Sequence, residues 1–326
     1  MTQQHMQGRE MSPSGGWQAT REKLDGDSLT LPNLVIAGVA KCGTTSLFAL
    51  LGQHPEIMPS DVKELQYFYP LAEGASDLPP LSTYADHFRG WAGQRYRLEA
   101  SPRYAWSGLR VIEALHTTLP NPHVIISLRD PVKRFWSAYR YLQSRGRLPR
   151  DLSCAGYLEL CERWIADPAS SPVRGSALTV GMYADYLPAW FEAFGDRLRI
   201  VFAERLAADA AAEVAALCRR LDLDETGVAA LDVTRRNTTI EARSRLVARG
   251  VEALRPLTRQ VFRARPEVRE TLRRFYGQVN GAPPTDTLDP AVAARLRELY
   301  ANSNANLANL LTRRGYQQLP EWLVHQ

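Results

Sequence analysis

The stretch Leu34-Val-Ile-Ala-Gly-Val-Ala-Lys-Cys-Gly-Thr-Thr-Ser-Leu47 joins a short apolar run to the start of a helix. We predict a buried strand over Leu34 to Ala37, a tight loop that begins at Gly38, and a helix that begins at Thr44. The backbone N–H groups of such a loop and the positive end of the helix dipole both favour an anion. The stretch therefore predicts a phosphate-binding loop.

The spacing from Gly38 to Gly43 matches the first half of a Walker A loop, but the second half differs. Walker A continues with Gly-Lys-Ser or Gly-Lys-Thr, whereas Thr44 takes the lysine position here and the lysine of this loop is Lys41. Phosphate binding is still expected. A nucleotide or small-molecule kinase would depend on Mg-ATP and a lysine directly after Gly43, so it is disfavoured but stays an alternative.

Outward from this loop, predicted strands and helices alternate. The other strands are expected at 96–100, 123–128 and 197–202. The helices are expected at about 44–53, 84–88, 107–118, 132–144, 152–166, 182–194, 207–221, 246–262, 266–276 and 290–313. Such alternation predicts an α/β fold of the P-loop type, a three-layer sandwich with a central parallel sheet flanked by helices. Residues 31–326 contain no clear linker and are predicted to form a single domain.

The bulk composition favours an anionic small-molecule ligand. The 326 residues include 40 Lys and Arg and 35 Asp and Glu, so the formal net charge is +5. A nucleic-acid-binding protein usually has a stronger excess of positive charge or a basic run. We therefore expect no nucleic acid as a partner. The sequence gives no indication of the oligomeric state.

Cysteines, histidines and apolar runs favour a cytoplasmic protein without a metal site. The four cysteines form no CxxC pair, as is typical of free thiols in a reducing compartment. The six histidines are spread singly and form no HxxxH, so no metal ligand set is expected. No apolar run approaches the roughly 18 residues of a membrane span. Residues 1–30 are polar and lack the apolar core of a signal peptide, so we predict a disordered leader.

Two motifs stand in the same order as in a known family. Gly38-Val-Ala-Lys-Cys-Gly-Thr-Thr-Ser-Leu47 resembles the 5′-phosphosulfate loop of sulfotransferases that use PAPS, 3′-phosphoadenosine 5′-phosphosulfate. Residues 124–139, Val-Ile-Ile-Ser-Leu-Arg-Asp-Pro-Val-Lys-Arg-Phe-Trp-Ser-Ala-Tyr, resemble the 3′-phosphate motif of the same family. That motif is a strand, then Arg-x-Pro, then a helix with a serine eight residues after the arginine. Arg129 and Ser137 stand at those two positions.

Further segments narrow the resemblance to the heparan-sulfate-type carbohydrate sulfotransferases. Lys63-Glu64-Leu-Gln-Tyr-Phe68 is similar to their Glu-x-Gln-x-Phe segment, and Glu99-Ala-Ser-Pro-Arg-Tyr104 to their Glu-Lys-Ser/Thr-Pro-x-Tyr stretch. Gly181-Met-Tyr183, followed by Trp190, is similar to their Gly-x-Tyr helix, and Leu319-Pro-Glu-Trp-Leu323 to their Leu-Pro-x-Trp-Leu. The resemblance spans residues 32–323.

The resemblance implies a donor site and a reaction. The family transfers a sulfuryl group from PAPS to a hydroxyl or amine, leaves adenosine 3′,5′-bisphosphate (PAP), and requires no metal. Lys41 is expected to stabilise the leaving phosphate. The loop residues expected at the 5′-phosphate are Lys41, Cys42, Gly43, Thr44, Thr45 and Ser46. Those expected at the 3′-phosphate are Arg129, Ser137 and a late basic loop, Arg243-Ser244-Arg245.

The acceptor side implied by the resemblance is less complete. Glu64 is expected to be the general base, and Glu99, Arg103 and Tyr141 are expected near the acceptor. Ala100 replaces a lysine of the family, Tyr141 replaces a histidine, and the cysteine pair of secreted members has no counterpart. The expected acceptor is a carbohydrate or a glycosylated or lipid-linked metabolite.

Plainer interpretations of these residues remain open. Arg129 is also consistent with an arginine that pairs with a carboxylate at a strand end, Ser137 with a small residue at a helix contact, and Glu64 with a solvated loop carboxylate. Tyr183 and Trp190 suit either core packing or contact with adenine. A non-catalytic nucleotide-binding protein of the same fold is a further alternative, although it would be expected to have lost the base.

Overall fold

The computed structural model describes most of the chain after the leader. The described residues are 29–149, 151–170, 175–226, 228, 241–242, 281–282 and 287–324. The helices expected at about 246–262 and 266–276, residues 1–28 of the leader and the Arg243-Ser244-Arg245 loop all lie outside these ranges. The predicted leader and that loop therefore stay predictions.

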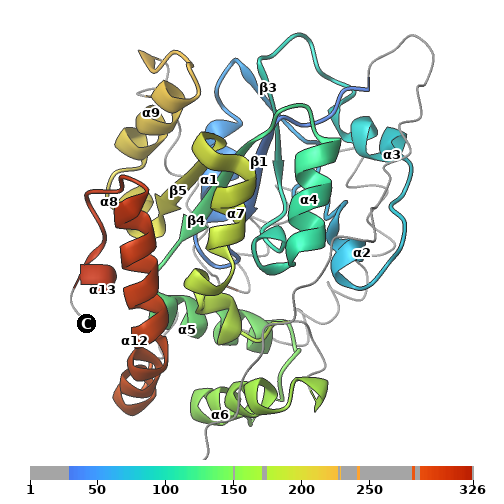
Figure 1. Cartoon of the computed structure of the whole chain (residues 1–326). Helices are drawn as coiled ribbons and strands as arrows, with labels where there is room; N and C mark the ends of the chain where they lie inside the picture. The colour runs from blue at the N-terminus through green and yellow to red at the C-terminus, as the bar shows by residue number, and fades with distance from the viewer. Residues whose placement is uncertain are drawn as a thin grey trace, which may run out of the picture.

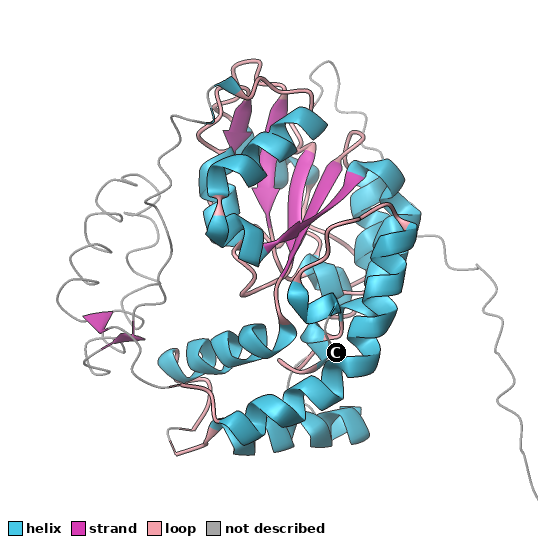
Figure 2. Ribbon diagram, turned by 90° about the vertical axis from the view of Figure 1, so that its left-hand side faces the viewer, coloured by secondary structure: helices cyan, strands magenta, loops and turns pink. Residues whose placement is uncertain are grey.

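Five parallel strands form the central sheet, in the order β2-β3-β1-β4-β5 (Figure 2). Their bounds are β1 (Leu34–Gly38), β2 (Ile57–Pro59), β3 (Tyr96–Ala100), β4 (His123–Leu128) and β5 (Leu198–Phe202). β1 lies in the middle, and all five of its residues are buried, as expected for a strand with helices on both faces. Two short antiparallel strands, β6 (Glu241–Ala242) and β7 (Gly281–Ala282), pair apart from this sheet.

Helices flank the sheet and confirm the predicted fold class (Figure 1). The bounds are α1 (Thr44–Leu51), α2 (Tyr69–Ala72), α3 (Leu81–Ala85), α4 (Leu109–Thr118), α5 (Pro131–Ser144), α6 (Cys154–Ala166), α7 (Leu187–Phe194), α8 (Ala203–Ala208), α9 (Ala210–Arg220), α12 (Pro290–Arg313) and α13 (Glu321–Val324). Short 3-10 helices lie at Asp86–Phe88, Tyr104–Trp106, Pro168–Ser170, Thr179–Gly181, Tyr183–Asp185 and Gly195–Arg197.

Alternate residues of β1 supply two cores. Val35 and Ala37 pack with side chains of α4 and α7, whereas Leu34 and Ile36 pack with those of α1 and α9. This is the two-residue period of a strand whose two faces are both covered. A third core joins α5, α6 and the N-terminal half of α12. It fixes α5, which begins directly after β4, against the rest of the domain.

Three local predictions were wrong. Ile57–Pro59, expected as loop, is the edge strand β2, where a proline is tolerated because one side of the strand needs no ladder hydrogen bond. The single helix expected at 207–221 is two helices, since the Asp209 side chain accepts from Ala212 N–H and starts α9 anew. The helix expected at 182–194 begins only at Leu187, after two 3-10 helices.

Within the described ranges, no helix is both long enough and apolar enough to cross a bilayer.

Candidate functional site

The predicted site residues lie in loops at one edge of the sheet. The carboxyl ends of parallel strands meet at a common edge, which is where open α/β sheets bind ligands. The strand order places Glu64 after β2, Glu99 at the end of β3, Lys41 after β1 and Arg129 after β4. Neighbouring strands lie about 4.8 Å apart, so β2 and β1 are separated by roughly 10 Å. The edge therefore presents the proposed base, the phosphate loop and the 3′-phosphate arginine in that spatial order.

The phosphate loop is tied to the neighbouring strand β4. Ser127 C=O accepts from Val39 N–H at 2.9 Å, and the Ser127 hydroxyl donates to Cys42 C=O. Gly43 has φ 81°, in the left-handed region that favours glycine. The first described bond of α1 runs from Leu47 N–H to Gly43 C=O. The N–H groups before it belong to the helix terminus that attracts anions.

Cys42 is a packing residue of this loop. Its side chain is fully buried, and its thiol lies 3.6 Å from the Tyr183 hydroxyl. Burial raises the pKa of the Cys42 thiol to about 11. A thiol in that state supplies no nucleophile at neutral pH. The backbone of Cys42 is engaged within the protein as well, since its N–H donates to Val39 C=O at 3.1 Å and its C=O accepts from the Ser127 hydroxyl.

Lys41 lies in a crowded cationic environment. Burial, followed by the nearby charges of Arg129 and Arg145, lowers the pKa of Lys41 to about 8. Its ammonium group lies over the Tyr141 ring, 4.5 Å from the centroid. The positive charges of Lys41, Arg129 and Arg145 lie close together, and such a cluster favours the binding of an anion.

The 3′-phosphate motif is positioned by the start of α5. The Asp130 side chain accepts from Val132 N–H at 2.8 Å and caps the helix, with Pro131 in its first turn. The Arg129 guanidinium donates to Lys41 C=O at 3.3 Å. Arg129 therefore lies where the end of β4, the cap of α5 and the phosphate loop come together. Among the described residues, no carboxylate forms an ion pair with Arg129.

Ser137 and Tyr141 share the face of α5 that is turned toward the phosphate loop. Residues four apart lie on one helix face, and the contact of Tyr141 with Lys41 fixes which face this is. The C-terminal Arg145 continues the row, with its guanidinium 5.4 Å from the Tyr141 ring centroid. Sequence reasoning missed Arg145, although its spacing from Ser137 and Tyr141 was a usable signal. Tyr141 therefore lies beside Lys41, and its expected place near the acceptor stays a prediction.

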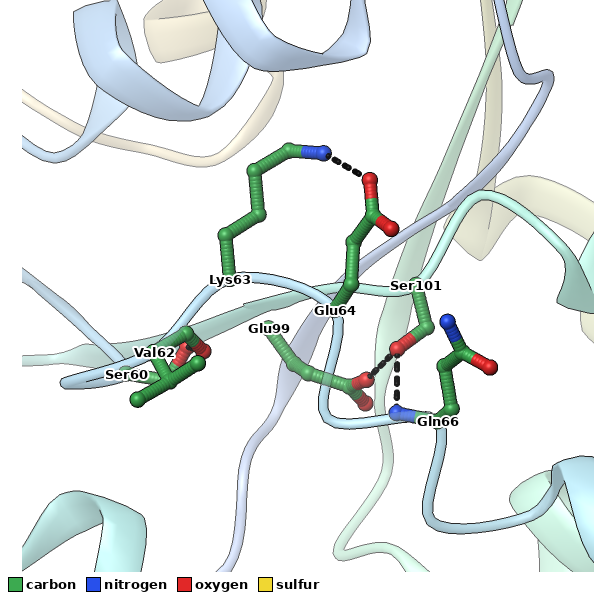
Figure 3. A network of polar contacts seen from close by, with 7 residues as sticks. All are labelled: Ser60, Val62, Lys63, Glu64, Gln66, Glu99 and Ser101. Atoms are coloured by element: carbon green, nitrogen blue, oxygen red, sulfur yellow. Dashed lines mark hydrogen bonds and ion pairs between the residues drawn. The ribbon is translucent and has the colours of Figure 1, made fainter. Parts of the chain in front are cut away.

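Glu64 lies in an extended loop after β2. Glu64 N–H donates to Ala100 C=O at 2.9 Å, which ties the loop to the end of β3. The Glu64 carboxylate is 48% exposed and forms an ion pair of 2.8 Å with Lys63 (Figure 3). The structure therefore leaves this carboxylate open to an incoming molecule, as a general base requires.

Glu99 does not lie where an acceptor could touch it. Its side chain is fully buried and accepts hydrogen bonds from the hydroxyls of Tyr84 and Ser101. Figure 3 shows Glu64 and Glu99 pointing apart, toward Lys63 and Ser101 respectively. The expected contact of Glu99 with the acceptor is not found, because the side chain is buried beneath α3 and the loop after β2 and is bonded to Tyr84 and Ser101.

Other predicted contacts are engaged within the protein. The Arg103 guanidinium lies 3.6 Å from the centroid of the Tyr69 ring and donates to the Tyr69 hydroxyl. Tyr183 and Trp190 are fully buried, and they donate to Arg129 C=O and Ala105 C=O respectively. Both aromatic residues therefore belong to the core rather than to an adenine contact.

A cavity of about 640 Å³ borders the far end of the Glu64 loop. It is lined by Gln66 and Tyr67 of that loop and by Asp61, Asp86 and His87 across it. Asp61 pairs with His87 at 2.6 Å. The phosphate loop and Arg129 contribute nothing to its described lining.

The comparison with protein families shows to which family the chain belongs. The family model described as the sulfotransferase domain matches residues 31–301. The chain belongs to this sulfotransferase family. The resemblance found in the sequence motifs is thereby confirmed, and the matched span contains the phosphate loop, the Glu64 loop and the Arg129 motif.

Individual relatives of this sulfotransferase are carbohydrate enzymes by name. Human carbohydrate sulfotransferase 15 is 28% identical over 219 residues, covering 50% of this chain and 38% of the relative. The Drosophila melanogaster bifunctional heparan sulfate N-deacetylase/N-sulfotransferase is 24% identical over 313 residues, covering 90% of this chain and 27% of the relative. The sulfotransferase thus spans well under half of either relative.

A solved structure supports the fold. A sulfotransferase from Alicyclobacillus acidocaldarius superposes with a TM-score of 0.64 at 23% sequence identity. The match covers 89% of this chain and 98% of that one. The architecture of the sheet and its flanking helices is therefore shared with a bacterial sulfotransferase along nearly its whole length.

Proposed function

We propose that this sulfotransferase moves a sulfuryl group from PAPS to a hydroxyl or amine of an acceptor and releases PAP. The observation that carries the proposal is the joint placement of Lys41, the α1 N-terminus and Arg129 at one sheet edge. An anion with a phosphate at each end suits this row of donors and cations. PAPS supplies the activated sulfuryl group, whose single charge leaves no need for a metal.

The transfer follows from the residues that face the ligand. The acceptor oxygen or nitrogen forms a bond to sulfur while the bond from sulfur to the bridging oxygen breaks. Glu64 takes the acceptor proton, and the electron pair of the broken bond remains on the 5′-phosphate of PAP. Lys41 stabilises the negative charge that develops there. Arg129 and Ser137 hold the 3′-phosphate by a charge-assisted fork and a hydroxyl donor.

The acceptor we propose is a carbohydrate or a glycosylated or lipid-linked metabolite. The names of the relatives support a carbohydrate, and the exposed Glu64 carboxylate supports access for a sizeable molecule. The cytoplasmic location stays a prediction.

The function is tested by transfer of labelled sulfate from PAPS to a panel of glycan, glycolipid and amine acceptors. PAP should raise the melting temperature, while Mg-ATP should not. Label transfer from Mg-ATP instead would favour the kinase alternative. Stabilisation by PAP without transfer to any acceptor would favour a non-catalytic nucleotide-binding protein. Neither stabilisation by PAP nor transfer would overturn the proposal.

Replacing Arg129 should weaken binding of the 3′-phosphate selectively. Loss of a charge-assisted hydrogen bond costs about 1.5–3 kcal/mol, so Arg129→Ala should raise the Kd for PAP roughly 10- to 100-fold. The Kd for adenosine 5′-phosphate, which lacks the 3′-phosphate, should not change. Calorimetry with both ligands measures the difference. Arg219→Ala, an exposed arginine on α9, is the matched control. Equal weakening of both ligands would contradict the assignment.

Affinity for PAP should fall as the pH rises above 8. Lys41 binds an anion only when protonated, and its pKa in the free protein is lowered to about 8, mainly by burial. Raising the pH from 7 to 9 lowers the protonated fraction of Lys41 from about nine tenths to about one tenth, so the Kd for PAP should rise about tenfold. The arginines beside it stay charged. Lys41→Met should show a flat profile over this window, and an equal decline in that variant would assign the effect to another group.

A further inference from the structure

The reaction as proposed makes no use of the buried Glu99. A fully buried carboxylate is costly unless hydrogen bonds replace its water, and Glu99 accepts such bonds from the Tyr84 and Ser101 hydroxyls, with the Tyr104 hydroxyl also bonded to it. Burial raises the pKa of Glu99, while the same hydroxyls act in the opposite direction. The structure therefore maintains an acidic side chain at the end of β3, between α3 and the loop that follows β2.

Ser101 connects Glu99 to the loop that carries the proposed base. A serine hydroxyl has one proton to donate and lone pairs to accept with. Its proton points to Glu99, so a lone pair faces Gln66 N–H, which donates to it at 2.8 Å (Figure 3). A second bond joins the same two segments: Glu64 N–H donates to the backbone C=O of Ala100, the residue before Ser101. The two bonds clamp the loop on both sides of Leu65.

The clamped residues have an unfavourable backbone. Glu64 has φ 69° and Gln66 has φ 55°, in the left-handed region that is disfavoured for residues with a Cβ. Such a conformation persists only when the surrounding structure holds it. The bonds from β3 to this loop provide that restraint, and the direction of the Glu64 side chain depends on it.

We propose that Glu99 is a positioning residue, which orients the Ser101 hydroxyl so that it holds the Glu64 loop in its left-handed conformation. The inference rests on the proposed role of Glu64 as base. Glu99 acts through Ser101 and the backbone and touches neither donor nor acceptor. Its effect should therefore appear in the rate of transfer and not in the binding of PAP.

The chemistry of the hydroxyl defines the test variants. In Glu99→Met no carboxylate remains to accept the Ser101 proton, so the Ser101 hydroxyl can turn its proton toward Gln66 N–H, where two donors would meet. Ser101→Ala removes the acceptor altogether. Tyr84→Phe removes a different hydroxyl that donates to Glu99 and leaves the Ser101–Gln66 bond in place, so it is the matched control for loss of one buried hydrogen bond.

Transfer kinetics are measured well below each variant's melting temperature, with PAP binding by calorimetry. Ser101→Ala and Glu99→Met should each lower kcat about tenfold, with the Kd for PAP and the KM for PAPS within about twofold of wild type. Tyr84→Phe should keep kcat near the wild-type value. Ser101→Ala added to Glu64→Gln should cause no further loss, because the positioned group is already gone.

The outcomes separate this inference from the proposed function. An inactive wild-type protein, or an active Glu64→Gln variant, would overturn the role of Glu64 itself. An active wild type with an inactive Glu64→Gln, but with Ser101→Ala and Glu99→Met at full kcat, would overturn the inference alone. The same holds if Ser101→Ala lowers kcat by the same factor in the Glu64→Gln background, since the effect is then general destabilisation. If Ser101→Ala fails to fold, Glu99→Met supplies the same comparison.

Discussion

The Lys41→Met variant is expected to transfer sulfate about 10²–10³-fold more slowly than wild type. Removal of a single group that stabilises negative charge in a transition state typically costs this much. Methionine keeps the length and apolar stem of lysine but has no charge to place beside the leaving phosphate. Because burial and the nearby arginines already lower the pKa of Lys41, its charge should be screened less by water than that of an exposed lysine. Single-turnover kinetics with saturating PAPS measure the chemical step.

The control for this variant is Lys133→Met. Lys133 lies on α5, its side chain is 64% exposed, and its nearest acidic group is Asp130 at 4.0 Å. Its replacement should leave the rate within about twofold, since exposed ion pairs contribute little. A Lys41→Met rate within tenfold of wild type would show that another group stabilises the leaving phosphate. Arg145, the next cation along this face of α5, would then be the residue to replace.

The Glu64→Gln variant is expected to lose about 10²–10⁴-fold in kcat, the contribution of a general base. The amide occupies the same volume and cannot accept a proton from the acceptor. Binding of PAP should be unchanged, because β3 separates the strand before Glu64 from the strand before the phosphate loop. Initial rates against acceptor concentration measure kcat, and the shift in melting temperature with PAP measures binding.

Glu73→Gln is the matched control for Glu64→Gln. Glu73 is an exposed carboxylate at the end of α2, outside the loop that β3 holds. Its replacement should keep full activity. Unchanged turnover in Glu64→Gln would show that Glu64 is not the general base. Glu64 would then be a solvated loop carboxylate that pairs with Lys63.

The donor side could be predicted from the sequence because its signals are local. A glycine-bearing loop between an apolar run and a helix start is recognisable within a few residues, and so is an arginine that follows a buried strand and precedes an Asp-Pro helix cap. The structure brings the two motifs together, because the Arg129 guanidinium donates to Lys41 C=O. Their proposed contacts with PAPS await the experiments described above.

The acceptor side was harder because its residues owe their position to contacts distant in sequence. Glu99 ends a strand that looked ordinary, and its burial depends on Tyr84 from α3 and on the loop after β2. The strand before that loop was missed, since β2 has only three residues and ends in proline. The contact between Tyr141 and Lys41 likewise depends on how α5 packs beside the phosphate loop, and the expected place of Tyr141 near the acceptor stays a prediction.

The sequence by itself determined the phosphate loop, the capped helix after Arg129 and the α/β class, because each depends on residues within one strand-to-helix unit. Only the tertiary structure decided the order of these units. The sheet runs β2-β3-β1-β4, which differs from the order in the chain, and this order separates Glu64 from Lys41 by one strand. The same order places the buried Glu99 on the strand between them. Strand pairing and helix packing determine which side chains lie together at a sheet edge, and these contacts cannot be predicted from a local sequence pattern.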